Sequence, residues 1–228
     1  GRPVDKQRAN LSLIRSWFHR CQHIHGRSCE ESGSAANNLP RLRVIDIYTR
    51  NVIVAPIGCR YIALSYVWGG MKQFEARKCD FRIDKHGQEY LPLPERLTRT
   101  ISDAFFVVES LGERYLWVDT LCIQQDSCED QHDQMMRMAA IYSSAALTIV
   151  AASGCDSDVG LQGISTPRRH KQHSKLIRGF RYAVNLPSYA ALEQGDRLIW
   201  NTRGWTFQEK IMSKRLLLFT DYQVYFRC

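Results

Sequence analysis

The chain has 228 residues, of which 44% are hydrophobic and 24% charged, and its formal net charge is +8. This composition is typical of a globular protein with a buried core, and no apolar run approaches the ~18 residues of a membrane span. The positive charge does not distinguish nucleic acid, anionic lipid and phosphorylated small molecules as partners. The eight cysteines are widely scattered, which predicts reduced thiols in an intracellular, cytoplasmic protein. The start at Gly1 and the end at Cys228 inside an apolar run predict a piece of a longer protein.

Apolar residues recur at helical spacing over 11–24, which predicts an amphipathic helix. Cys21, His25 and Cys29 lie at intervals of four, and such residues can bind zinc, but a structural zinc site needs four ligands. Packing of one helix face fits three equally spaced residues better, so no metal site is predicted. A polar linker and a hairpin then complete a predicted N-terminal appendage, residues 1–57.

The main domain is predicted over 58–228, and it opens with YIALSYVWGG, residues 61–70, which reads as a buried strand stopped by two glycines. Strands and helices then alternate, with a basic insertion at about 155–200. Further strands are expected at 115–119, 147–152, 215–219 and 222–227, and helices at 97–111, 128–142 and 205–212. The methionines of the 128–142 helix are expected to fill the core. This alternation predicts an α/β fold, an open, mostly parallel sheet with helices on both faces.

Ligands of such sheets bind beyond the carboxyl ends of the parallel strands. Ser65, Tyr66, Trp68 and Gly69 lie where the first strand ends, so we expect them to open into a cleft; the alternative is a core strand with a structural turn. Asp119 ends the second strand and either faces the same cleft or accepts hydrogen bonds from its own loop.

Glu209 lies one helical turn after Trp205, so both side chains share a face. Arg203 precedes them near a helix N-terminus, where backbone amides attract anions. An aromatic platform, a cation and a carboxylate suit a nucleotide; the alternative for Glu209 is a surface ion pair with a neighbouring basic residue. The sequence has no dinucleotide fingerprint, phosphate loop or nucleophile elbow. Cys122 has no evident basic neighbour to activate it.

Three blocks, YIALSYVWGG, LWVDTLCIQQ and RGWTFQE, occur in this order between Tyr61 and Glu209. Together they resemble the signature blocks of the fungal heterokaryon incompatibility (HET) domain. This resemblance implies a fungal protein that triggers cell death when incompatible strains fuse, with self-association and protein partners.

A more distant resemblance is to Toll/interleukin-1 receptor (TIR) domains, whose flavodoxin-like sheet would fit the predicted strand order. YIALSYVWG is similar to the first TIR strand and LTIVAAS to the third. The Trp205–Glu209 spacing is similar to the Trp-x-x-x-Glu of NAD-cleaving members, from which this chain departs by its insertion. The resemblance implies that NAD is a substrate, with no prosthetic group, and that Glu209 is catalytic. It places the other candidate residues, at the strand ends and before Glu209, around the nucleotide: Ser65, Tyr66, Trp68, Gly69, Asp119, Arg203 and Trp205.

Two other functions compete with NAD cleavage. A non-enzymatic domain could signal death by assembling with itself or with protein partners. Nucleic-acid binding through Arg168–Arg181 is disfavoured, because only Phe180 and Tyr182 provide aromatic rings there.

Overall fold

The computed structural model describes residues 3–25, 29, 39–194, 198–202 and 204–228. Its centre is a mixed sheet in the order β11-β10-β7-β3-β6-β1-β2-β5-β4. The strands of this sheet are β1 Arg43–Asp46, β2 Asn51–Val54, β3 Tyr61–Ser65, β4 Arg82–Ile83, β5 Glu89–Pro92, β6 Tyr115–Trp117, β7 Leu147–Ala151, β10 Leu216–Phe219 and β11 Val224–Arg227. The helices are α1 Leu11–Ile24, η2 Lys78–Asp80, α3 Arg99–Leu111, α4 Asp119–Cys122, α5 Cys128–Ser144, α6 Tyr189–Gln194, η3 Ile199–Thr202 and α7 Gly204–Met212.

Four parallel strands form the middle of the sheet, in the order β6-β3-β7-β10. In chain order these are the second, first, third and fourth parallel strands, and every residue of β3, β7 and β10 is buried. Continuous apolar runs form such strands because both sheet faces are covered. The predicted α/β sheet is therefore present, and antiparallel strands extend it at both ends, so it is mixed.

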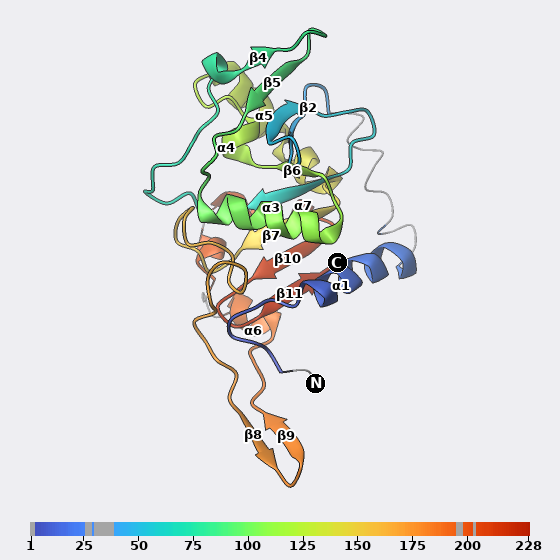
Figure 1. Cartoon of the computed structure of the whole chain (residues 1–228), viewed down its shortest axis with the longest axis vertical. Coiled ribbons are helices and arrows are strands. Elements are labelled where there is room, and N and C mark those ends of the chain that lie inside the picture. Colours follow the sequence, from blue (N-terminus) through green and yellow to red (C-terminus); the bar gives the residue numbers. More distant parts are fainter. Residues whose placement is uncertain (1–2, 26–28, 30–38, 195–197, 203) are drawn as a thin grey trace.

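Helices cover both faces of the sheet. α1 contacts α3, and both lie in front of the sheet in Figure 1, whereas α5 contacts α7 and both lie behind it. α3 buries Ile101, Val108 and Leu111 and ends at Gly112, whose φ of 78° closes the helix in the left-handed conformation. The sheet is therefore the middle of three layers, with α1 and α3 on one face and α5 and α7 on the other.

The predicted N-terminal hairpin is part of the same sheet. β1 pairs with β2 and, on its other side, with β6, where Ile45 lies opposite Leu116. An ion pair of 2.6 Å between Arg114 and the buried Asp46 lies at this junction. The boundary at residue 57 remains a prediction.

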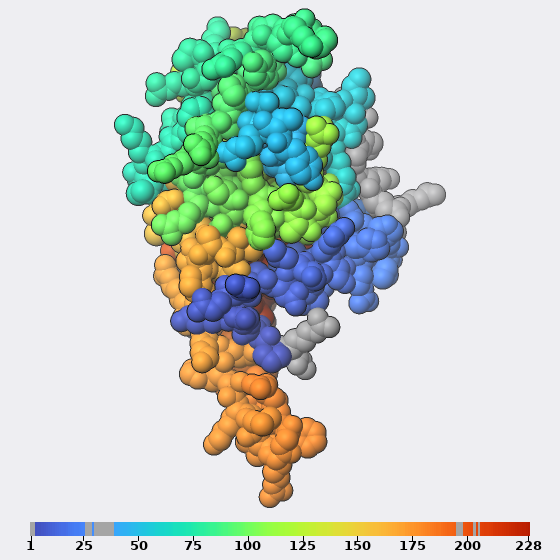
Figure 2. Space-filling model, in the orientation of Figure 1, coloured from blue at the N-terminus to red at the C-terminus, as the bar shows by residue number. Residues whose placement is uncertain are grey.

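The inserted segment divides into a projecting part and a packed part. β8 (Ser174–Ile177) and β9 (Phe180–Ala183) form a hairpin in which every residue is exposed, and it extends away from the rest of the molecule (Figures 1 and 2). Arg168, the first residue of the basic stretch Arg168–Arg181, is only 2% exposed and donates to the backbone oxygens of Asp5 and Arg8. Among the described residues, no helix combines the length and apolarity needed to cross a membrane.

Candidate functional site

A cavity of about 310 Å³ lies beyond the carboxyl ends of β3 and β6, between α5 and α7. Two carboxylates, Asp119 and Glu209, and the indole of Trp68 line it. They come from three separate parts of the chain: the start of α4, the middle of α7 and the segment after β3. The sheet therefore brings together three of the residues that the sequence placed at a common cleft.

Glu209 is only 9% exposed and accepts a hydrogen bond from the hydroxyl of Ser65, the last residue of β3. The same Ser65 Oγ accepts the indole N–H of Trp200 at 2.6 Å. The neighbouring Lys210 pairs with Glu193 of α6. Glu209 thus lies at the cavity wall, joined to the central strand, and not on the outer surface.

Asp119 combines both arrangements that the sequence allowed. One carboxylate oxygen accepts the backbone N–H of Thr120 at 2.7 Å, and the other accepts the indole N–H of Trp68 at 2.9 Å. The bond to Thr120 orients the carboxylate at the start of α4, and the bond to Trp68 fixes the edge of the indole ring. Asp119 therefore positions an aromatic side chain at the cavity while lining it.

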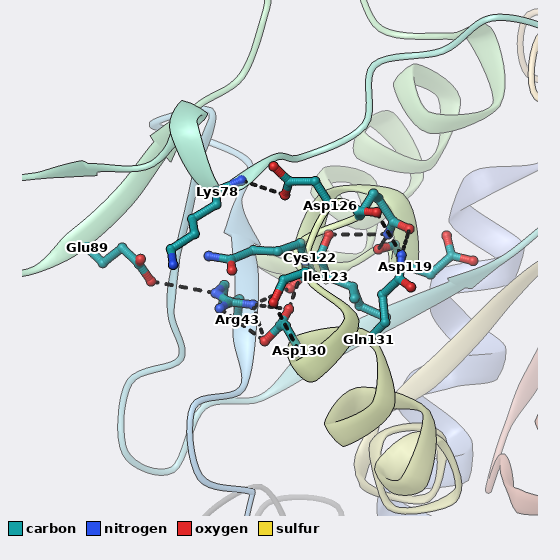
Figure 3. Close-up of polar contacts among 12 residues, drawn as sticks. Arg43, Lys78, Glu89, Asp119, Cys122, Ile123, Asp126, Asp130 and Gln131 are labelled. Carbon is teal, nitrogen blue, oxygen red and sulfur yellow. Dashed lines mark hydrogen bonds and ion pairs between the residues drawn. The ribbon is translucent and has the colours of Figure 1, made fainter.

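The turn between α4 and α5 forms another wall and is held by Arg43 from β1 (Figure 3). The guanidinium of Arg43 donates to the carbonyl oxygen of Cys122 at 3.1 Å and pairs with Asp130 at 2.9 Å. Asp130 also accepts the backbone N–H of Gln124 at 2.8 Å. Figure 3 shows the Arg43–Asp130 pair on one side of this turn and Asp119 on the other.

Cysteine chemistry does not fit this site. Cys122 lies in α4 next to the cavity wall but is only 1% exposed, and burial raises the pKa of its thiol to about 12. A thiol with so high a pKa is a poor nucleophile near neutral pH. The reactive groups that the described wall offers are therefore the two carboxylates.

Besides Ser65, two of the predicted binding residues are not among the described lining residues of the cavity. Tyr66 is 3% exposed, and its hydroxyl donates to Gln73 Oε1 at 3.0 Å and lies 3.1 Å from Thr120 Oγ1. Gly69 has a φ of 66°, and a Cβ atom there would lie 2.5 Å from the Cβ of Asp156. Gly69 therefore permits a close approach of two loops.

The remaining two predicted residues cannot be placed at the cavity. Arg203 lies outside the described residues. Trp205 lies in α7, and its side chain is outside the described part of the structure.

Five lining residues were not predicted: Ile123, Gln125, Gln131, Met135 and Met138. Three of them come from α5 at spacings of four and three, which is the signal of one helix face. The expectation that the methionines fill the core is corrected for Met135, which is 50% exposed and lines the cavity, whereas Met138 packs against the core and also lines the cavity. The two glutamines belong to a polar chain in which Gln131 donates to the Gln125 carbonyl oxygen at 2.8 Å and Gln125 to that of Asp119 at 3.0 Å.

Comparison with known proteins shows that the lining residues of the cavity fall within the part of the chain that matches a protein family. A family model described as heterokaryon incompatibility protein (HET) matches residues 61–209, a range that contains Ser65, Trp68, Asp119 and Glu209. The chain is 34% identical over 110 residues to "Heterokaryon incompatibility protein 6, OR allele" of Neurospora crassa. That alignment covers 46% of this chain and 15% of the relative, so the chain spans a small part of the relative's length. No solved structure matches the chain.

Proposed function

The chain belongs to the heterokaryon incompatibility (HET) family, and from this premise we propose that it is the part of a fungal incompatibility protein that triggers cell death. The proposed activity is cleavage of the bond between nicotinamide and ribose in NAD, in domains that have self-associated. The observation that carries the proposal is the Ser65–Glu209 contact, which holds a carboxylate at a cavity beyond the central parallel strands.

The strand order supports the TIR-like part of this proposal. The parallel strands lie in the order second, first, third, fourth, which is the order of the corresponding strands in flavodoxin-like sheets. Ligands of those sheets bind beside the first strand, at the carboxyl ends. Ser65 is the last residue of that strand here, and the cavity begins next to it.

The proposed chemistry needs one fixed carboxylate. Nicotinamide in NAD is cationic and leaves as a neutral ring with the bonding electrons, so positive charge develops at ribose C1′ and the ring oxygen. Glu209 stabilises this charge or forms a bond to C1′, as the carboxylates of glycoside hydrolases do. Water then adds to C1′ and loses a proton, and the products are nicotinamide and ADP-ribose. The Ser65 hydroxyl keeps Glu209 oriented, so little reorganisation is needed as the charge appears.

The other lining groups suit the rest of the substrate. The indole of Trp68, whose edge is fixed by Asp119, offers a face on which a flat ring can stack. The cavity volume is at the lower end of the ~300–1,000 Å³ typical of ligand pockets, so we expect it to take the nicotinamide ribose. The adenosine would then extend outside, and the net charge of +8 favours approach of the anionic pyrophosphate.

The proposal is tested by NAD loss in the presence of the purified chain, dilute and at high concentration with a crowding agent. Glu209→Gln should lower the rate at least about a hundredfold, because it removes a preorganised charge. Glu193→Gln is the matched control, since this carboxylate pairs with Lys210 away from the cavity. Thermal unfolding checks that both variants fold. Equal NAD loss in the parent chain and in the folded Glu209→Gln variant would remove Glu209 from the reaction.

One observation favours a second function, signalling by assembly without catalysis. The projecting hairpin exposes Ile177, Phe180 and Tyr182 at 46%, 71% and 59% of their surfaces, and the strand register places all three on one face. Apolar side chains gathered at an exposed site commonly mark a protein-binding surface. Fungal cells that express the Glu209→Gln variant distinguish the two functions. Full killing by this variant, together with loss of killing when the three hairpin residues become serine, would favour assembly.

A further inference from the structure

A second cluster of reactive side chains lies apart from the cavity. Cys21 and His25 are four residues apart at the C-terminal end of α1, Cys29 follows, and Cys228 comes directly after β11. One ligand atom from each of these four residues lies within 4.8 Å of all the others. The sequence offered only three candidates because the fourth is about two hundred positions away along the chain.

The spacing of the four atoms matches a tetrahedral metal site. Zn–S bonds of about 2.3 Å and Zn–N bonds of about 2.0–2.1 Å place neighbouring ligand atoms roughly 3.5–3.8 Å apart. The Nδ1 atom of His25 lies 3.4 Å from the sulfur of Cys228 and 4.0 Å from that of Cys29. The three cysteines are free thiols, and all four residues come close enough to share one ion.

A buried arginine donates hydrogen bonds to two residues of the cluster. Arg215 is 1% exposed, and its Nε donates to the sulfur of Cys21 at 3.0 Å. The same guanidinium donates to the backbone oxygens of Cys29 and, at 2.9 Å, Ala146. Hydrogen bonds from the protein to metal-bound sulfur orient the ligand and tune the site. Three thiolates and one imidazole around Zn²⁺ carry a net charge of −1, which the guanidinium offsets.

We propose that Cys21, His25, Cys29 and Cys228 bind one structural zinc ion. Soft thiolate ligands with one imidazole select zinc over magnesium, calcium or manganese. Four protein ligands complete the coordination and leave no open position for a substrate, as in structural sites. The ion joins the helix at the beginning of the chain to the strand at its end.

Contacts between α1 and β11 beside the cluster indicate what the zinc ion stabilises. The rings of Trp17 in α1 and Phe226 in β11 have centroids 6.4 Å apart, and both side chains line a hollow beside the cluster. β11 pairs on one side with β10 and is the last strand of the sheet order. The zinc ion therefore adds a link between α1 and this edge strand, beside its ladder with β10 and the hydrogen bond from Tyr225 to the carbonyl oxygen of Pro187.

Metal analysis of the purified chain, prepared without chelator and without a histidine tag, tests the proposal. We expect about one zinc ion per chain, and Cys228→Ser should lose most of it. Cys79→Ser is the matched control, because Cys79 is an exposed free thiol outside the cluster and should keep the metal. Removal of zinc by a strong chelator should lower the unfolding temperature by about 5 °C or more, and added zinc should restore it.

Cobalt substitution keeps the test decisive if Cys228→Ser fails to fold. With Co²⁺, the chain should show tetrahedral d–d bands and a thiolate-to-cobalt charge-transfer band. Cys228→His retains four ligands, so it should keep the tetrahedral bands and lose about a third of the charge-transfer intensity. Absence of metal after refolding with zinc, an unchanged charge-transfer band in Cys228→His, or a disulfide between Cys29 and Cys228 in the reduced-buffer preparation would overturn the proposal.

Discussion

Replacing Arg43 by methionine should lower the free energy of unfolding by about 3 kcal/mol. The Arg43 side chain is 9% exposed and lies between β1 and the start of α5. It makes hydrogen bonds of 2.9–3.2 Å to both carboxylate oxygens of Asp130 and one of 3.1 Å to the carbonyl oxygen of Cys122. Methionine has a similar length and no charge, so the substitution removes these bonds with little change in packing.

The expected loss of stability follows from the Asp130 carboxylate, which loses its partner when Arg43 is replaced. Breaking a buried ion pair by removing one partner costs about 3–5 kcal/mol, because the other charge remains buried without compensation. Asp130 keeps the backbone N–H of Gln124 at 2.8 Å, and its side chain is 16% exposed. Both facts reduce the penalty, so we expect the lower end of that range.

Urea unfolding followed by circular dichroism measures the loss. Arg99→Met is the control, because Arg99 is 61% exposed in its pair with Asp158 and such pairs contribute at most about 1 kcal/mol. The double variant Arg43→Met/Asp130→Asn should regain part of the stability, since no buried charge is left alone. A loss below about 1 kcal/mol for Arg43→Met would refute the reasoning, because that is the value of an exposed pair.

Two further predictions concern a tight turn and an acidic residue. Gly69→Ala should destabilise the chain more than Gly87→Ala, because both glycines have positive φ but only at Gly69 would a Cβ atom meet a neighbour, Asp156, at 2.5 Å. Equal unfolding temperatures of the two variants would contradict this. Burial raises the pKa of Asp46, but hydrogen bonds from Arg114 and from backbone N–H groups outweigh it and leave the pKa below its usual value. The stability from this carboxylate is therefore complete above about pH 5 and lost as the pH falls below about 4. The stability difference between the parent chain and Asp46→Asn, measured by urea unfolding from neutral to acidic pH, should shrink in that range; a constant difference would count against the ion pair.

Elements with strong local signals could be predicted from the sequence. The helix expected over 11–24 is α1, with the same bounds, and the helix expected over 97–111 ends at Leu111. Ser127 caps α5 by accepting the backbone N–H of Asp130, three residues later, which is the spacing typical of a helix N-cap. These features depend on residues within one or two turns of each other, so a sequence pattern contains them.

The candidate site could be predicted only in part, because its contacts join distant segments. The carboxyl ends of β3 and β6 could be assigned to one edge from the alternation of elements, and in the structure Trp68 and Asp119 meet at the cavity while Ser65 bonds to the lining residue Glu209. Met135 was misjudged, because a helix face directed at a cavity and one directed at a core have the same periodicity. The proximity of Cys228 to Cys21, His25 and Cys29 could not be predicted for a similar reason, since Cys228 gave no local sign of a partner in α1.

The long segment between β7 and α7 provides the group that orients the proposed catalytic carboxylate. It returns to the sheet at Trp200, which is fully buried and whose backbone N–H bonds to the carbonyl oxygen of Ala152 at 3.3 Å. The indole N–H of Trp200 can only donate, so it occupies a lone pair of Ser65 Oγ. The single hydroxyl hydrogen of Ser65 is then directed to an acceptor on the other side, and that acceptor is Glu209. The insertion that separates α7 from β7 along the chain therefore sets the direction of the hydrogen bond that holds Glu209 in place.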